Sequence, residues 1–86
     1  MTGNPKRSSK ARWTAQYALF ITRLVQARND AGLTQRGAAE LLGRSQSFVA
    51  KSESGERRVD IVELASFASV YQKPIDFFIP DEAKRK

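Results

Sequence analysis

Hydrogen-bonding side chains gather on one face of the short segment 45–54. When this segment is drawn as a helix, Gln46, Ser47 and Lys51 fall on one side. The opposite side carries the apolar Phe48. Amide, hydroxyl and ammonium groups can form hydrogen bonds with base edges in the major groove of DNA. An ordinary solvated helix face has a similar composition, so the pattern alone leaves both interpretations open.

The three polar side chains differ in how well each could discriminate between bases. The amide of Gln46 can pair with adenine by donating to N7 and accepting from the N6 amino group. Lys51 can reach guanine O6 and N7, or a backbone phosphate. The hydroxyl of Ser47 can bond to several bases, so we expect it to discriminate weakly.

Composition excludes most catalytic and metal chemistry. The 86 residues include no cysteine and no histidine, which removes thiolate nucleophiles, thiolate metal sites and the commonest general base. We therefore expect no enzyme, no cofactor and no metal. The 15 basic and 9 acidic residues give a net charge of +6, which favours a polyanionic partner. No signal peptide or membrane-spanning run is visible, so a cytoplasmic location without membrane attachment is expected.

The elements that position these side chains are all predicted to be helices. Apolar periodicity, together with cap and stop residues, predicts five helices in one domain, 13–80. Thr14, Thr34, Ser45 and Asp60 are the expected N-caps, and Gly32, Gly43 and Gly55 are the expected stops. The predicted helices are 13–31, 34–43, 45–54, 60–72 and 75–79.

Two stripes of apolar residues are expected to form the core. The predicted stripe of the first helix comprises Tyr17, Phe20, Ile21, Leu24, Val25 and Ala31. The predicted stripe of the fourth helix comprises Ile61, Leu64, Ala65, Ala68 and Tyr71.

The two ends of the chain differ from the predicted domain in composition. Residues 1–12 carry four basic residues and no acid, and residues 81–86 are a charged tail. The first segment can be a solvated tail or a basic arm that follows phosphates or enters the minor groove. The sequence of this segment does not distinguish between these two interpretations.

The segment 32–55 resembles the lambda-repressor/Cro-type (XRE-family) helix-turn-helix. The residues that carry this resemblance are Gly32-Leu33-Thr34-Gln35, Ala39, Leu42-Gly43, Ser45-Gln46, Val49 and Glu53-x-Gly55. The resemblance extends from about Phe20 to Ile79. It implies an all-α, five-helix, lambda-repressor-like DNA-binding domain.

The resemblance implies a role for each matching position. Base contacts are expected from Gln46, Ser47 and Lys51. Gln35 is expected to contact a phosphate and to brace Gln46. Arg28 and Glu53 are expected to form an internal ion pair, with a direct phosphate contact as the alternative for Arg28. The full set of predicted phosphate-contacting residues is Thr34, Gln35, Arg44, Arg57 and Arg58.

Four residues depart from the pattern of the family. Gly37, Ala38 and Ser52 are small where relatives usually carry larger or more helix-forming residues, so we expect a thin core. A glycine inside a helix costs about 0.5–1 kcal/mol relative to alanine. Phe48 can fill part of this space, or it can border the groove and contact a thymine methyl group.

A sequence-specific transcriptional regulator is the expected function, and specifically a repressor that binds a palindromic operator in double-stranded DNA as a homodimer. Two recognition helices one DNA turn apart, about 34 Å, would read both half-sites. Phe77, Phe78 and Ile79 are the candidate dimer interface, with burial in the core as the alternative. A competing hypothesis is an antitoxin-type interaction module that neutralises a toxin and regulates its own operon. A third is a basic adaptor that bridges DNA-bound proteins or the transcription machinery.

Overall fold

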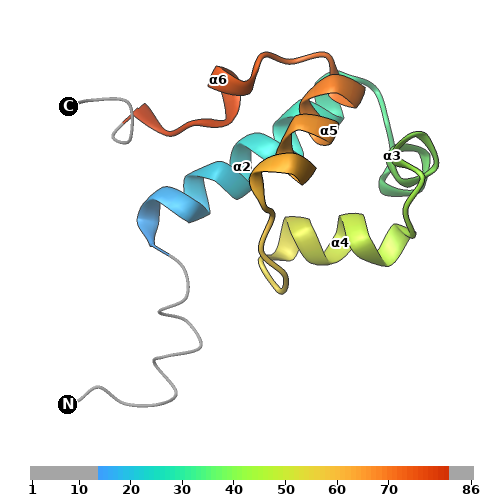
Figure 1. Ribbon diagram of the computed structural model, residues 1–86, viewed down its shortest axis with the longest axis horizontal. Coiled ribbons are helices and arrows are strands. Elements are labelled where there is room, and N and C mark those ends of the chain that lie inside the picture. The colour runs from blue at the N-terminus through green and yellow to red at the C-terminus, as the bar shows by residue number, and fades with distance from the viewer. Residues whose placement is uncertain (1–13, 82–86) are drawn as a thin grey trace.

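Five α-helices follow one another along residues 14–81, the part of the chain that the computed structural model describes (Figure 1). They are α2 (Ala15–Asp30), α3 (Gln35–Leu42), α4 (Gln46–Ser54), α5 (Ile61–Tyr71) and α6 (Ile75–Phe78). No strand occurs within that range, so the all-α prediction is confirmed. The predicted basic arm 1–12, Trp13 and the tail residues 82–86 lie outside the described residues.

Side-chain caps set the starts of the four longer helices. The hydroxyl of Ser45 accepts the amide hydrogen of Phe48 at 3.1 Å, and that of Thr34 accepts the amide hydrogen of Gly37 at 2.9 Å. Thr14 caps α2, and Asp60 caps α5, in the same way. Each cap satisfies a backbone donor that the first turn leaves unpaired. All four predicted N-caps are therefore confirmed.

Two glycines mark the ends of the helix-turn-helix elements. Gly43 ends α3 at φ 70°, and Gly55 ends α4 at φ 84°. Both values lie in the left-handed region, which an L side chain disfavours by its Cβ contacts. The turn between α3 and α4 is consequently short, with only residues 43–45 between the two helices.

The core forms where α2, which passes behind α5 in Figure 1, contacts both α5 and α4. Leu24 of α2 and Val49 of α4 are fully buried, as are two aromatic side chains, Phe67 and Phe78. The N-terminal part of α2 also packs against α6. This arrangement leaves one side of α4 outside the bundle.

The predicted core stripes were partly wrong. Phe67 and Ala27 are fully buried although neither was included in a stripe, and Ile61 is 68% exposed although it was. Ile61 lies in the first turn of α5, where no helix of residues 14–81 covers it, and the buried side of this helix begins at Leu64. Ala65, Ala31 and Val25 also lie outside the buried core, the first two exposed and the third half-buried.

The expected thin core contains stacked aromatic side chains from α4 and α5. Ala38 and Ser52 are fully buried in spite of their size. The ring of Phe67 stacks on Phe48 with their centroids 5.7 Å apart and an interplanar angle of 10°. Phe48 of α4 and Phe67 of α5 thus supply stacked aromatic rings to the same core.

Candidate nucleic-acid interface

One face of α4 is exposed and polar while the other is buried. Gln46, Ser47 and Lys51 are exposed, whereas Val49 and Ser52 are fully buried. The predicted division of this helix into two faces is therefore present in the structure. A helix with one anchored face and one polar, exposed face can enter the major groove without unpacking.

The buried hydroxyl of Ser52 is satisfied within α4. It donates to the carbonyl oxygen of Phe48, one turn earlier, at 2.7 Å. A buried hydroxyl without such a bond would be destabilising. Ser52 thus allows α4 to lie close to the core without leaving an unpaired polar group.

Arg28 and Glu53 form a bidentate ion pair that joins α2 to α4. Arg28 Nε donates to Glu53 Oε2 at 2.7 Å and Nη2 donates to Oε1 at 3.1 Å. The side chains are only 13% and 6% exposed. The third Arg28 nitrogen, Nη1, donates to the carbonyl oxygen of Leu33 at 2.8 Å, which ties the pair to the loop before α3. Of the two interpretations for Arg28, the structure contains the internal ion pair.

Gln35 belongs to the same partly buried polar network. Its side-chain Nε2 donates to Glu53 Oε1 at 2.9 Å. The resemblance implied that Gln35 would brace Gln46; in the structure its side-chain amide donates to Glu53, and the brace of Gln46 stays a prediction. Gln35 therefore links the start of α3 to the last turn of α4, and its phosphate contact stays a prediction.

The network affects protonation in two places. The hydrogen bond with Glu53 raises the pKa of Arg28 above its usual value, in spite of the opposing effect of burial. Burial also raises the pKa of the Tyr71 hydroxyl, for which no hydrogen-bond partner is found within residues 14–81. The Tyr71 hydroxyl therefore stays neutral, and the Arg28 guanidinium stays charged, across the pH range in which proteins bind DNA.

Phe48 supports two arginines. The guanidinium carbon of Arg44 lies 3.9 Å from the centre of its ring, and that of Arg57 lies 4.5 Å from it. Such cation–π contacts hold a charged group in place without neutralising it. The half-buried ring of Phe48 contacts Phe67 as well, so it fills core space and carries the two basic groups.

Arg57 is also held by a carboxylate. Its two terminal nitrogens donate to the two carboxylate oxygens of Glu63, at 3.0 and 2.9 Å. This pair raises the pKa of Arg57 and lowers that of Glu63. Because both terminal nitrogens already make hydrogen bonds, a phosphate contact would have to share or displace Glu63. The predicted phosphate contact of Arg57 stays a prediction.

The other predicted phosphate-contacting residues differ in how they are held. Arg58 is exposed, and its guanidinium lies 4.3 Å from the centre of the Tyr17 ring. Arg44 is exposed above Phe48. Thr34 is exposed, with its hydroxyl engaged as the cap of α3.

The three predicted dimer residues lie in different environments. Phe78 is fully buried against Phe20, with their ring centroids 6.5 Å apart. Phe77 is half-buried and lies under the guanidinium of Arg23. Ile79 is half-buried at the C-terminal edge. Within one chain, Phe78 thus takes the core role that was the alternative for this segment.

Sequence reasoning missed the partner of Arg57, although a signal was present. Asp60-x-x-Glu63 has the spacing of a capping box, in which the glutamate turns back toward the start of its helix. The structure contains this box, since Glu63 accepts the amide hydrogen of Asp60 at 3.1 Å. That backward turn brings the carboxylate of Glu63 to Arg57, just before the helix.

Comparison with known proteins agrees with this geometry. A family model described as a helix-turn-helix domain matches residues 20–76. A solved structure described as an XRE-family like protein from Pseudomonas syringae pv. tomato str. DC3000 superposes with a TM-score of 0.72. The two sequences are 37% identical, and the alignment covers 83% of this chain and 87% of that chain. No curated protein sequence matches the chain.

Two capped helices joined by a short glycine turn, the second with an exposed polar face, define a helix-turn-helix DNA-binding protein. More narrowly, the chain belongs to the XRE family of such proteins. It is a DNA-binding regulator by class. Within residues 14–81, no helix has the length and apolar character needed to cross a bilayer.

Proposed function

We propose that this protein is a sequence-specific transcriptional repressor of the cytoplasm that binds a palindromic operator as a homodimer. The observation that carries the proposal is the exposed polar face of α4, with Gln46, Ser47 and Lys51 at its surface. The ion pair of Arg28 and Glu53 joins α4 to α2. A rigid support of this kind keeps base-reading side chains in place before DNA arrives.

The size of α4 supports two copies per operator. A helix of nine residues is about 14 Å long, so one copy can read only a few base pairs. A two-fold dimer doubles the site and matches a palindrome. Repression then needs only occupancy, because a dimer bound across a promoter excludes the polymerase.

Exposed arginines next to α4 supply the electrostatic part of binding. Arg44 and Arg58 are both exposed, and each lies over an aromatic ring that limits its movement. If each subunit neutralises about three phosphates, the slope of log K against log salt will be about −5 for the dimer. A slope near zero would contradict this electrostatic interface.

Selection of bound DNA from a random pool tests the proposal. We expect a palindromic sequence to be enriched, with half-sites about one helical turn apart. Gln46→Ala should lose about 1–3 kcal/mol of discrimination at one base pair per half-site. Gln26→Ala is the matched control, since it truncates an exposed glutamine on α2. An unchanged selected sequence for Gln46→Ala would remove this residue from the base-reading set.

A second candidate function is a protein-interaction module, such as an antitoxin that also regulates its own operon. The observation that favours it is an apolar surface made by Leu41 and Val62, which are 63% and 72% exposed. These two residues line a groove of about 400 Å³ between α3 and α5. A toxin gene in the neighbouring reading frame, and binding of its product to this surface, would favour this function.

A further inference from the structure

An acidic side chain lies among the basic residues that follow α4. Glu63 accepts hydrogen bonds from both terminal nitrogens of Arg57, at 3.0 and 2.9 Å. It also lines a small hollow together with Arg44 and Phe48, the ring over which both arginines lie. The hydrogen bonds from Arg57, and in addition the charge of Arg44, lower the pKa of Glu63, so the carboxylate is ionised at neutral pH. A negative charge thus lies within the surface that is expected to meet phosphates.

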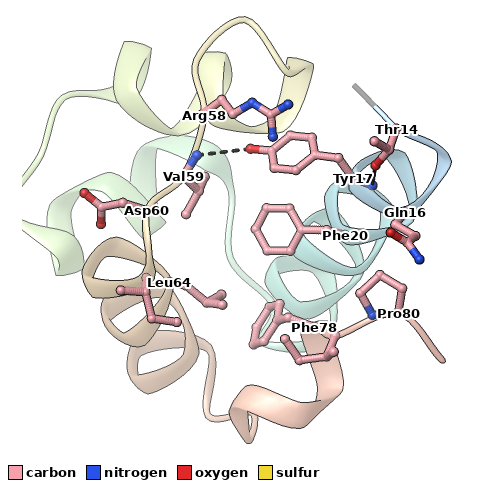
Figure 2. A pocket seen from close by; sticks show the side chains of 12 residues that line it. Thr14, Gln16, Tyr17, Phe20, Arg58, Val59, Asp60, Leu64, Phe78 and Pro80 are labelled. Atoms are coloured by element: carbon pink, nitrogen blue, oxygen red, sulfur yellow. Dashed lines mark hydrogen bonds between the residues drawn. The ribbon is translucent and has the colours of Figure 1, made fainter. Parts of the chain in front are cut away.

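The backbone of Arg57 is fixed next to the recognition helix. Its amide donates to the carbonyl oxygen of Lys51, in the last turn of α4, at 3.2 Å. Two residues later, the amide of Val59 donates to the hydroxyl of Tyr17 on α2, at 3.0 Å (Figure 2). These two bonds hold the connection between α4 and α5 in place. Only the Arg57 side chain therefore has to move if a DNA phosphate replaces Glu63.

The neighbouring Arg58 has no such counter-charge. Its guanidinium carbon lies 4.3 Å from the centre of the Tyr17 ring (Figure 2). Within residues 14–81, no ion pair includes Arg58. A cation over an aromatic ring keeps its charge, whereas an arginine paired with a carboxylate is part of a neutral group. Two consecutive arginines are thus available to a phosphate to different degrees.

We propose that Glu63 is an autoinhibitory residue of the DNA interface, whose carboxylate competes with DNA phosphates for Arg57. The inference rests on the DNA binding of the proposed function, and it names a residue that limits the strength of this binding. In the free protein, Arg57 is paired within the chain. A phosphate can bind the same nitrogens only after it has displaced this pair, so part of the free energy of the new contact is offset.

Carboxylate and phosphate offer a guanidinium the same geometry. Each presents two oxygen atoms to two parallel N–H groups, so the two acids are alternative partners for one arginine. Glu63 is well placed to compete, because the amide of Asp60 donates to its Oε1 at 3.1 Å and keeps the carboxylate turned toward Arg57. After displacement, Glu63 remains as a negative charge close to the phosphate, and this repulsion adds to the free energy needed to break the pair.

Binding of the full-length protein to one half-site of the selected DNA, and to random DNA, tests the proposal. Glu63→Gln removes the negative charge and keeps an oxygen for the cap of α5, since glutamine also occurs at this position of a capping box. At about 0.15 M salt we expect about fivefold tighter binding of the half-site, the upper limit for a pair this close to the surface, and tighter binding of random DNA as well. The slope of log K against log salt should become steeper by about one.

Glu56→Gln is the matched control for charge. Glu56 is exposed and directly precedes Arg57, and within residues 14–81 no ion pair includes it. The variant removes the same unit of charge near α4 without freeing an arginine, so it should tighten binding by less than about twofold at the same salt concentration. Equal effects of Glu56→Gln and Glu63→Gln would show that only the long-range field matters, and would overturn the competition.

A double-mutant cycle tests whether the effect passes through Arg57. We expect Glu63→Gln to tighten binding about fivefold in an Arg58→Gln background, in which Arg57 is intact. In an Arg57→Gln background the same substitution should have an effect below about twofold, because no arginine is freed. Effects of equal size in the two backgrounds would contradict the assignment. Circular dichroism shows whether each variant remains folded.

The sign of the change separates competition from positioning. If Glu63 instead held Arg57 in the orientation that a phosphate requires, Glu63→Gln would weaken binding, and this result would overturn the proposal. Random DNA separates this inference from the proposed function, since competition for Arg57 does not require a specific site. If the wild type enriches no sequence while Glu63→Gln still binds random DNA more tightly, the sequence-specific function fails and the competition stands. If the wild type prefers its selected site and Glu63→Gln changes neither affinity, the competition alone fails.

Discussion

Two bidentate arginine–carboxylate pairs lie at or just after the end of α4, and they differ mainly in burial. The pair of Arg28 and Glu53 joins α4 to α2, and its side chains are 13% and 6% exposed. The pair of Arg57 and Glu63 follows α4, and its side chains are 33% and 15% exposed. The bond lengths are similar, with the four bonds between 2.7 and 3.1 Å.

Equal geometry does not make these pairs equal in energy. In the protein interior, removing one partner leaves an uncompensated charge that cannot regain its hydration, which is strongly destabilising. Near the surface, water and salt replace the lost partner, and the net contribution is usually below about 1 kcal/mol. We therefore infer that the first pair positions α4, and that the second mainly orients one arginine at the surface.

Glu53→Ala should produce the largest loss of stability. Arg28 would remain buried without its carboxylate, and Gln35 would lose its acceptor. We expect the free energy of unfolding to fall by about 3 kcal/mol, the lower end of the range for a broken buried pair. Urea denaturation measures it. A loss below about 1 kcal/mol would show that water reaches the pair. Burial would then not explain a difference in energy between the two pairs.

Phe48→Ala should give the next largest effect. The substitution removes the stack on Phe67 and the surface beneath Arg44 and Arg57. For this half-buried ring we expect a loss of about 2 kcal/mol in the free energy of unfolding. Relative preference among DNA sequences should stay unchanged, as competition binding would show. A change of preference at a thymine with little loss of stability would instead indicate a direct base contact.

Local signals explain why so much of this fold could be predicted. Cap side chains at Thr34, Ser45 and Asp60, with left-handed glycines at Gly43 and Gly55, act within one turn of the chain. Helix boundaries depend on such short-range contacts, and the predicted ones agree with the structure to within about two residues.

The missed features depend on contacts between distant parts of the chain. Phe67 and Ala27 are buried because of how α2 and α5 cross, which the period of one helix does not determine. Gln35 donates to Glu53, 18 residues away, a contact that the resemblance did not imply. The family resemblance located the ion pair of Arg28 and Glu53, and the structure adds that Gln35 belongs to it.

Arg57→Gln tests the more exposed pair. We expect the free energy of unfolding to fall by less than about 1 kcal/mol, because a third of the Arg57 side chain is in solvent. Arg28→Gln is the matched variant, and it should cost several times more. The same Arg57 variant tests the predicted phosphate contact, since loss of one contact would reduce the steepness of the salt dependence by about one. An unchanged slope of log K against log salt would show that Arg57 contacts Glu63 and no phosphate.

The pH dependence of stability should show the smallest effect. The hydrogen bonds from Arg57 lower the pKa of Glu63 below its usual 4.5, so the folded state holds this proton less tightly than the unfolded state. The stabilisation is therefore complete above about pH 4.5 and is lost as the pH falls through the lowered pKa. Glu63→Gln should be destabilised by less than about 1 kcal/mol at pH 7, with the difference from wild type shrinking below pH 4. Urea denaturation of both proteins from pH 3 to pH 7 measures this difference. If the difference in the free energy of unfolding between the two proteins stayed constant over this range, the pair would stabilise the protein by shape and packing rather than by charge.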